Sequence, residues 1–358
     1  MFFLNSPLIA IDIGTSAIKV LELGGNQNKR RLLSMGIELL PRGVVQDGEI
    51  RDPATVVKTI QTLLQRLAIK TKNRRVSLAV SGNAVIVKRI NIVLDTEIEI
   101  GEQLFEEAKQ QFHHDMEDMY FRFQVIESEY KKADETSALI VAAKIAVIEQ
   151  YVQVVHELGM KVGVIDCDSL CISNMFEFNY PIADALCAIV DIGASTSQII
   201  VSYNGEFLFN REIYMGGDMV TQRIAESLDV DFENAESIKL SASGGDATLM
   251  EQVRPAIADV IAMITNEVQA TISFFLDGEE FPAELKKISY VYLTGGGANT
   301  LDLAQAISTL VQAPVQILNP FHNIDTDNFG SDMETMLSQA PLYGVVLGLG
   351  LRKMNDDQ

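Results

Sequence analysis

The sequence predicts an α/β protein made of two similar halves, with a small α+β unit inserted into the first half. A strand that ends in Asp, one apolar residue, Gly and small residues occurs twice, at residues 11–16 (IDIGTS) and 190–196 (VDIGAST). Each copy opens a run of three strands, which indicates an internal duplication. Between the halves, a strand–helix–strand–strand–helix pattern predicts the insert. We therefore expect two lobes that face one ligand, each with an acidic turn.

The first half is expected to form a mixed sheet with one helix packed on it. Apolar runs predict strands at residues 8–13, 18–23, 32–38 and 75–81. Asp52 and Pro53 suit the N-cap and the first position of a helix, and apolar residues with helical period follow as far as Leu67. The turn at Gly14 joins the first two strands.

Residues 84–160 are expected to be the inserted unit. Two apolar stripes with helical period end at Phe112 and Leu158, and Gly159 suits the end of the second helix. Strands are predicted at residues 85–92, 120–126 and 139–143.

The second half repeats the opening of the first. A strand at residues 162–165 and a helix from about Ser169 lead into it. Asn204-Gly205 between two apolar runs is typical of a hairpin turn. The remaining expected elements are strands at 188–192, 198–203, 206–214, 288–294 and 315–318, a helical region at 218–277, a helix before residue 315, and an apolar helix at 343–351.

Composition excludes several function classes. The chain of 358 residues has 28 basic and 49 acidic residues, a net charge of −21, which argues against nucleic-acid binding and against unaided docking on anionic lipid. That charge suits a basic partner segment or serves solubility. No apolar run reaches the length of a membrane span, and the N-terminus lacks the basic region of a signal peptide, so we expect a cytoplasmic protein. Three sparse cysteines indicate buried, reduced thiols.

The paired acidic turns predict a nucleotide site with a metal ion. A carboxylate beside a triphosphate is repelled by it, so Asp12 and Asp191 suit a cation that they hold through bound water, as Mg²⁺ allows. Either Asp alone would be a turn cap, but the pair favours the metal. Lys19 is either a solvated charge or a phosphate contact, and strand alternation leaves both open.

Three further segments of the second half have a functional and a structural interpretation. Gly216 and Gly217 precede a helix whose free amides suit an anion or ribose hydroxyls, or they permit tight packing. Glu236 and Lys239, three residues apart on one helix, are by themselves a surface ion pair. The three glycines at 295–297 follow a strand directly, and their bare backbone suits the close passage of a base or sugar.

Taken in order, these segments resemble the signature regions of the actin-like ATPase superfamily. The resemblance implies a duplicated actin-like (ribonuclease H-like) ATPase fold, with two lobes around a nucleotide cleft. The insert resembles the extra subdomain of the FtsA and PilM proteins. The matching regions are residues 11–19 and 190–197 (phosphate loops), 164–174 and 340–351 (connectors), and 293–299 (adenosine motif).

Within the superfamily the chain is most similar to the PilM family of type IV pilus assembly proteins. The segments that carry this likeness are residues 7–14, 18–20, 47–50, 52–53, 81–89 and 166–169. The family resemblance implies binding of ATP or ADP with Mg²⁺, and a location at the cytoplasmic side of the inner membrane through partner proteins. It also implies a grip on the N-terminal cytoplasmic tail of a PilN-like membrane protein, in a groove beside the insert and within the pilus platform complex.

The same resemblance gives a domain division and a set of site residues. The first lobe comprises residues 1–83, 161–187 and 341–358, the insert 84–160, and the second lobe 188–340. Asp12 and Asp191 are the metal ligands through water. The expected nucleotide contacts are Asp12, Gly14, Thr15, Ser16, Lys19, Asp191, Gly193, Ala194, Ser195, Thr196, Gly216, Gly217, Asp218, Glu236, Lys239, Gly295, Gly296, Gly297 and Asn299.

Asp168 is the candidate catalytic residue, because an acidic group near this place orients the attacking water in related ATPases. Its alternative is the N-cap of the helix near Ser169. We expect slow or negligible ATP turnover. The competing functions are a small-molecule kinase with Asp168 as general base, which a screen of sugars and polyols tests, and a filament former of the FtsA kind, which ATP-dependent sedimentation tests. Residues 352–358 have no apolar face, which weighs against a division role, and a homo-oligomer is compatible with these features.

Overall fold

The computed structural model describes residues 7–26, 29–112, 116–127, 134–278, 286–327, 329 and 337–353. Residues 354–358, part of the C-terminal segment considered above, lie outside the described residues. Contacts divide the chain into two compact units. Among the described residues, the first unit comprises 7–171 and 345–353, and the second comprises 172–278 and 286–344.

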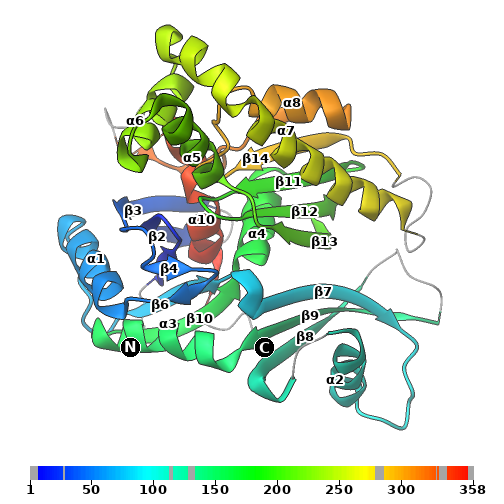
Figure 1. Ribbon diagram of the computed structural model, residues 1–358. Helices are drawn as coiled ribbons and strands as arrows, with labels where there is room; N and C mark the ends of the chain where they lie inside the picture. The colour runs from blue at the N-terminus through cyan, green and yellow to red at the C-terminus, as the bar shows by residue number, and fades with distance from the viewer. Residues whose placement is uncertain are drawn as a thin grey trace. The chain divides into compact units, whose positions relative to one another are not determined.

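The first unit contains a mixed sheet with the strand order β10-β6-β1-β2-β3 (Figure 1). β1 pairs antiparallel with β2 and parallel with β6, and β6 pairs parallel with β10. The carboxyl ends of β1, β6 and β10 therefore lie side by side at one edge of the sheet. The strands are β1 (Ile9–Ile13), β2 (Ala17–Asn26), β3 (Lys29–Leu39), β6 (Arg75–Val80) and β10 (Lys161–Cys167).

Helices cover both faces of this sheet. α1 (Pro53–Arg66) and α3 (Ile145–Glu157) share one apolar core with Ile11, Val20 and Leu78. Asp52 caps α1 as predicted, since its carboxylate accepts from the Thr55 amide at 3.1 Å. On the other face lies α10 (Gly344–Leu351), whose Leu349 carbonyl accepts from the Ser77 hydroxyl at 3.1 Å.

A two-residue hairpin that the sequence analysis did not predict packs against the end of β6. β4 (Val45–Gln46) and β5 (Glu49–Ile50) are joined by Asp47 and Gly48, both with positive φ, as a tight hairpin turn requires. A Cβ at Gly48 would overlap the Ser81 carbonyl. The buried Tyr151 of α3 donates to the Gly48 carbonyl at 3.0 Å, so the hairpin tip is held from two sides.

The insert is a three-stranded antiparallel sheet of order β7-β9-β8, with α2 packed on one face. Leu104 and Ala108 of α2 meet Ile90 and Ile140 of the sheet in a core of their own. α3 follows β9 directly but buries Val154 and Val155 in the larger core of the first sheet. The elements are η1 (Gly82–Ala84), β7 (Val85–Ile92), α2 (Ile100–Gln111), η2 (Met116–Asp118), β8 (Met119–Ile126) and β9 (Thr136–Lys144).

The second unit repeats the sheet plan of the first. Its strand order is β13-β12-β11-β14-β15, and β11 pairs antiparallel with β12 and parallel with β14, as β1 does with β2 and β6. The duplication predicted from the two acidic turns is therefore confirmed. The strands of this sheet are β11 (Leu186–Ile192), β12 (Ser197–Tyr203), β13 (Glu206–Ile213), β14 (Tyr290–Thr294) and β15 (Val315–Ile317). The short β16 (Ile324–Asp325) also falls in this unit but is not a strand of this sheet.

The helical region predicted for residues 218–277 is three helices, of which α7 is the longest and contains Pro255. The helices of this unit are α5 (Gly217–Leu228), α6 (Phe232–Ser243), α7 (Ala247–Asp277), α8 (Leu303–Val311) and η5 (Ala340–Tyr343). The chain passes from the first unit to the second within α4 (Asp168–Asn179) and returns at the start of α10. In the described part of the chain, no helix combines the length and the apolarity that crossing a membrane requires.

The cysteines are buried free thiols, as the sequence predicted. Burial raises the pKa of the thiols of Cys167, Cys171 and Cys187 above the usual 9.0, that of Cys187 to about 11. For Cys167 and Cys171 the carboxylates of Asp166 and Asp168 add to this increase.

We expect these thiols to be unreactive toward a thiol reagent such as DTNB at about pH 8 in the folded chain, and reactive in urea, because the thiolate is the nucleophile. The folded chain holds these protons at a pH where the unfolded chain releases them. The contribution of these thiols to the free energy of unfolding is therefore complete below about pH 9 and is lost as the pH rises further. Thiol titration with and without urea, and urea unfolding between about pH 7 and pH 10, measure both effects. Rapid reaction of a folded-state thiol contradicts the expectation.

Candidate functional site

The two acidic turns have the same backbone geometry. In the first, the Gly14 amide donates to the Ala17 carbonyl at 3.1 Å, and in the second the Gly193 amide donates to the Thr196 carbonyl at 3.0 Å. A Cβ at Gly193 would lie 2.8 Å from the Thr196 oxygen, so the turn requires glycine. Each turn places its Asp on the last residues of a buried strand, with the small residues of the loop at the surface or half-buried.

Asp12 is held by Lys19 across the first hairpin. The two residues are direct partners in the β1–β2 register, and Lys19 Nζ lies 2.8 Å from Asp12 Oδ2. Both side chains are largely buried, with 16% and 8% of their surface exposed. Lys19 is therefore not a solvated charge. Its ammonium lies beside the carboxylate at the first acidic turn, where a positive charge can neutralise an anion as well as Asp12.

The second turn has a neutral residue at the matching position. Asp191 is the register partner of Gln198, and the buried Oε1 of Gln198 accepts no hydrogen bond from the described residues. The Ser197 hydroxyl donates to the Met215 carbonyl at 2.7 Å, which ties the second turn to the strand end before α5. The two turns therefore have the same backbone hydrogen bond but differ in the charge of the residue opposite the Asp.

The start of α5 packs directly on the second turn. The amides of Gly217 and Asp218 donate to the carbonyls of Gly193 and Ala194, at 2.9 and 2.8 Å. A Cβ at Gly216 would overlap the Ala194 carbonyl. The expectation that the amides of Gly217 and Asp218 are free is wrong, because the loop carbonyls already accept from them. The alternative, glycines that permit tight packing, is what the structure has.

Lys239 is not part of a surface ion pair, contrary to the interpretation of Glu236 and Lys239 in isolation. Its side chain is 12% exposed, and Nζ lies 2.6 Å from Glu236, 2.8 Å from the Thr221 hydroxyl and 3.3 Å from the Gly217 carbonyl. This network connects α6 to the first turn of α5. An i, i+3 spacing describes one helix and carries no information on the second helix, which covers the lysine.

The three glycines after β14 approach the second turn from the other side. Gly295 has φ +84°, its amide donates to the Pro341 carbonyl at 2.8 Å, and a Cβ there would lie 2.5 Å from the Ile192 oxygen and overlap the Asp191 carboxylate. The Gly297 amide donates to the Ile192 carbonyl at 2.8 Å. Gly296 and Asn299 are exposed. The bare backbone of Gly295 and Gly297 therefore meets β11 itself, and Gly296 keeps the open surface.

In the second unit, the structure thus brings most of the expected site residues to one end of its sheet. Hydrogen bonds, an ion pair and close backbone approaches connect four parts in one cluster: the second turn, the start of α5, the Glu236–Lys239 pair and the glycines 295–297. Thr221 and Gln198 also belong to this cluster, although the sequence analysis did not identify them as site residues. A lone threonine in an amphipathic helix gives no signal, whereas the position seven residues after Asp191 could have pointed to Gln198.

In the first unit, Asp12 and Asp168 share the carboxyl edge of the sheet with the Ser81–Gly82 turn between them. The register pairs Cys167 with Val80, so Asp168 comes directly after the paired strands. Asp168 is the first residue of α4, one position earlier than expected. Burial raises the pKa of Tyr151, and the charges of Asp168 and Asp12 raise it further, because all three side chains share this edge.

Neighbouring Asp166 has a structural role. One of its carboxylate oxygens accepts from the Cys167 amide at 2.8 Å and the other lies 3.2 Å from Arg352 Nε, so it fastens the end of α10. Within the described ranges, no group of three or more His, Cys, Asp or Glu residues is placed so that it could hold a metal ion.

Known proteins are similar to this chain in sequence and in structure. The family described as "Type IV pilus assembly protein PilM" matches residues 10–354. A solved PilM–PilN type IV pilus biogenesis complex superimposes with a TM-score of 0.84 at 23% identity, covering 97% of this chain and 98% of the other. MreB5 of Spiroplasma citri bound to AMPPNP has a TM-score of 0.51 at 16% identity, over 96% and 94% of the two chains.

Among curated proteins, the cell division protein FtsA of Staphylococcus epidermidis is 24% identical over 382 residues, which are 92% of this chain and 78% of that protein. The structural likenesses to the PilM–PilN complex and to MreB5 confirm the actin-like ATPase fold predicted from the sequence.

Proposed function

The chain belongs to the family of the type IV pilus assembly protein PilM, and we propose that it binds ATP or ADP with Mg²⁺ and a PilN-like membrane partner. Pilus assembly is the function of the family. The partner segment that we propose is the short N-terminal cytoplasmic tail of the PilN-like protein. The chain would then work at the cytoplasmic side of the inner membrane, held there by its partners in the pilus platform.

One observation carries the nucleotide part of this proposal: two turns closed by the same backbone hydrogen bond, each with a carboxylate at its start. The hydroxyls and amides of residues 15–16 and 194–196 are suited to phosphate oxygens. Asp12 and Asp191 offer oxygen ligands of the kind that Mg²⁺ takes directly or through water. A bound Mg²⁺ would neutralise phosphate charge. Lys19 would contribute a second positive charge next to Asp12.

For the second unit we propose that the open surface at Gly296 and Asn299 receives the adenosine, with Glu236 and Lys239 beside it. The Lys239 network supports this, because it fixes two titratable side chains close to the second turn. We propose Asp168 as the residue that orients water if ATP is hydrolysed, and slow turnover at most. We further propose that nucleotide binding changes the partner groove beside the insert.

We also retain the domain division as a proposal: a first lobe of residues 1–83, 161–187 and 341–358, an insert of 84–160, and a second lobe of 188–340. The separate core of the small sheet supports an insert. The packing of α3 in the larger core indicates that this helix anchors the insert to the first lobe.

A pull-down tests the partner part of the proposal. The bait is a synthetic peptide of the N-terminal cytoplasmic tail of the single-pass membrane protein encoded beside this gene. We expect the chain to be retained by the peptide, with an affinity that differs between nucleotide-free protein and protein saturated with Mg²⁺ and ATP. A scrambled peptide is the control. Equal retention by both peptides would show that the tail is not the recognised partner.

A further inference from the structure

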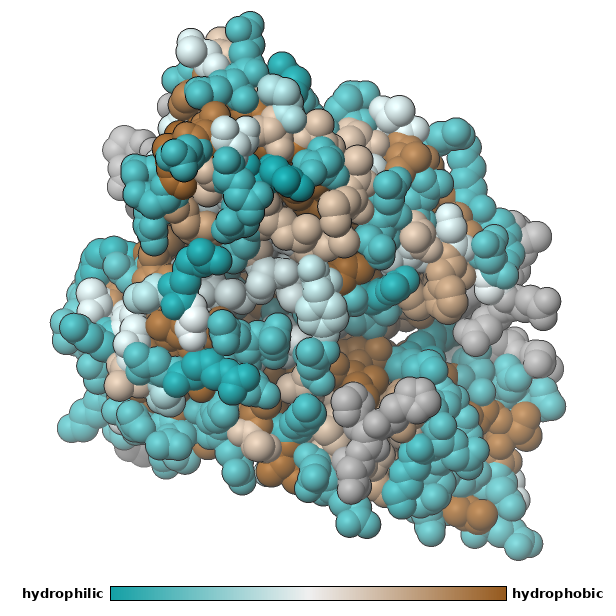
Figure 2. All heavy atoms as spheres, in the orientation of Figure 1, coloured by the Kyte–Doolittle hydropathy of each residue, from teal (hydrophilic) through white to brown (hydrophobic). Residues whose placement is uncertain are grey.

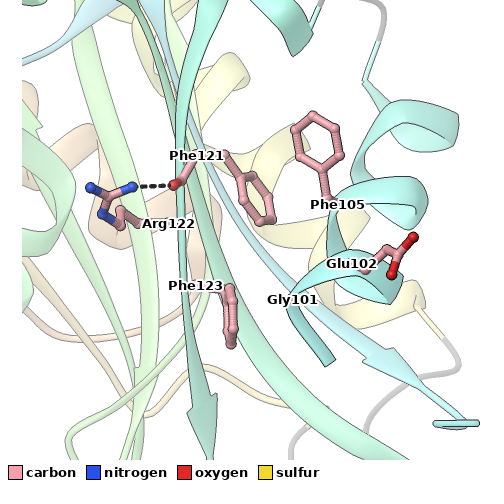
Figure 3. Close-up of a pocket in the computed structure, with 6 residues that line it drawn as sticks. All are labelled: Gly101, Glu102, Phe105, Phe121, Arg122 and Phe123. Carbon is pink, nitrogen blue, oxygen red and sulfur yellow. Dashed lines mark hydrogen bonds between the residues drawn. The ribbon is translucent and has the colours of Figure 1, made fainter. Parts of the chain in front are cut away.

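The insert has an aromatic pocket of its own, between the start of α2 and the middle of β8. Its volume is about 480 Å³, and it is lined by Gly101, Glu102, Phe105, Phe121, Arg122 and Phe123. Figure 3 shows the rings of Phe121 and Phe123 on the side of β8 that faces α2, with Arg122 on the opposite side. The Arg122 guanidinium donates to the Phe121 carbonyl at 2.9 Å.

The three phenylalanine rings form one apolar wall. Phe105 and Phe121 meet edge to face with centroids 5.3 Å apart, and Phe121 and Phe123 are 6.2 Å apart. All three rings are half-buried and pack against the core of the insert. Partly exposed aromatic side chains that line a hollow are typical of a binding site, since burying them in a complex releases free energy.

A glycine in the first turn of α2 keeps this pocket open. A Cβ at Gly101 would lie 3.0 Å from Phe123 Cε1, so the missing side chain leaves room for the ring. Glycine inside a helix costs about 0.5–1 kcal/mol relative to alanine, and the α2 sequence bears this cost where the helix meets the pocket.

The pocket lies beside an edge strand that carries one charge. β8 is the outer strand of its sheet, with the sequence MYFRFQVI, and Tyr120 and Val125 are 47% and 46% exposed. Edge strands are commonly protected by charged residues or proline, and an unprotected edge suits pairing with an extended segment. Figure 2 shows that hydrophilic residues cover most of the insert and leave separate hydrophobic patches.

The surroundings of the pocket are strongly acidic. Residues 93–112 and 116–127 contain nine Asp and Glu but only Lys109 and Arg122 as bases. Lys109 Nζ lies 4.8 Å from the centre of the Phe105 ring, a cation–π geometry that a basic side chain of a partner can also adopt on these rings. A second copy of the chain would bring an equally acidic surface, at a net charge of −21 for each copy.

We propose that the Phe105–Phe121–Phe123 pocket is a docking surface for an extended partner segment with alternating apolar and basic side chains. The apolar side chains enter between the rings. The basic ones face the carboxylates of α2, among them Glu102. This surface lies within the insert and needs no nucleotide, so the inference extends beyond the proposed nucleotide site.

A tryptophan-bearing peptide provides the test, because the chain itself contains no tryptophan. The probe is Lys-Trp-Lys-Val-Lys-Phe-Lys, whose emission shifts to the blue when the indole is buried. We expect a saturable shift with the full chain. Glu102→Lys should weaken the peptide about fivefold, as loss of one attraction and gain of one repulsion implies. The matched control Glu157→Lys, on the exposed end of α3, should change the affinity less than about twofold.

The variant Gly101→Met distinguishes binding in the pocket from general charge attraction. The methionine side chain would fill the space next to Phe123 without changing any charge. We expect this variant to lose the blue shift while its circular dichroism stays that of the parent. The proposal is overturned if the shift persists in Gly101→Met, or if Glu157→Lys weakens the peptide as much as Glu102→Lys. It is overturned equally if the tryptophan-free peptide Lys-Ser-Lys-Ser-Lys-Ser-Lys displaces the probe at concentrations close to the affinity of the probe itself.

Discussion

Alanine at both Asp12 and Asp191 should lower the affinity for Mg²⁺-ATP by at least about 100-fold, because each carboxylate contributes about 1.5–3 kcal/mol as a charged hydrogen-bonding group. The expected loss depends on Mg²⁺. Nucleotide measured in EDTA should bind the parent and the variant with similar low affinity. Isothermal titration with ATP and ADP, with and without Mg²⁺, measures both effects.

The single variants should differ from each other. Asp12→Ala leaves the ammonium of Lys19, only 16% exposed, without the carboxylate that lies 2.8 Å away, so this variant should also lose thermal stability. Asp191 faces the neutral Gln198, so Asp191→Ala should lose affinity with less loss of stability. Glu157→Ala, on the exposed end of α3, is the matched control for removal of a charge. Unchanged nucleotide affinity in the folded double variant would show that the ligand site lies elsewhere.

The part of the site that depends on local pattern was predictable from the sequence. A buried strand, an Asp and a glycine turn are fixed by neighbouring residues, and both copies adopt the same hydrogen bond from Gly14 or Gly193 to the residue three positions on. The strands and the capped helix α1 follow from alternation, helical period and the Asp52 cap for the same reason.

What remained open in the sequence depends on contacts between distant elements. Strand alternation could not decide between solvent and Asp12 for Lys19, and helical spacing could not reveal that Thr221 buries Lys239. Positions 216 and 295 require glycine because neighbouring backbone occupies the space that a side chain would need. This backbone comes close only because α5 and the end of β14 pack on the second turn. The β4–β5 hairpin escaped prediction because strands of two residues have no measurable period.

We expect the second large effect at Gly348 of α10, where this helix lies against Cys171 of α4. A Cβ at this position would overlap the Cys171 carbonyl oxygen of α4 and lie 2.7 Å from Cys171 Cα. The obstacle is helix backbone, which no rotamer change relieves. Gly348→Ala should therefore lower the free energy of unfolding by about 2–3 kcal/mol or more, as overpacking of a tight core does.

The sign of this effect distinguishes packing from helix propensity. Propensity alone predicts that alanine stabilises a helix by about 1 kcal/mol relative to glycine. Gly350→Ala is the matched control, because it lies in the same helix and its Cβ would meet the flexible Leu21 and Leu23 side chains at 2.7 and 3.2 Å. Urea unfolding of the parent and both variants measures the difference. If Gly348→Ala proves as stable as Gly350→Ala, the backbones of α4 and α10 do not touch at Cys171. If it is much less stable, the close contact between Gly348 and the Cys171 backbone is confirmed.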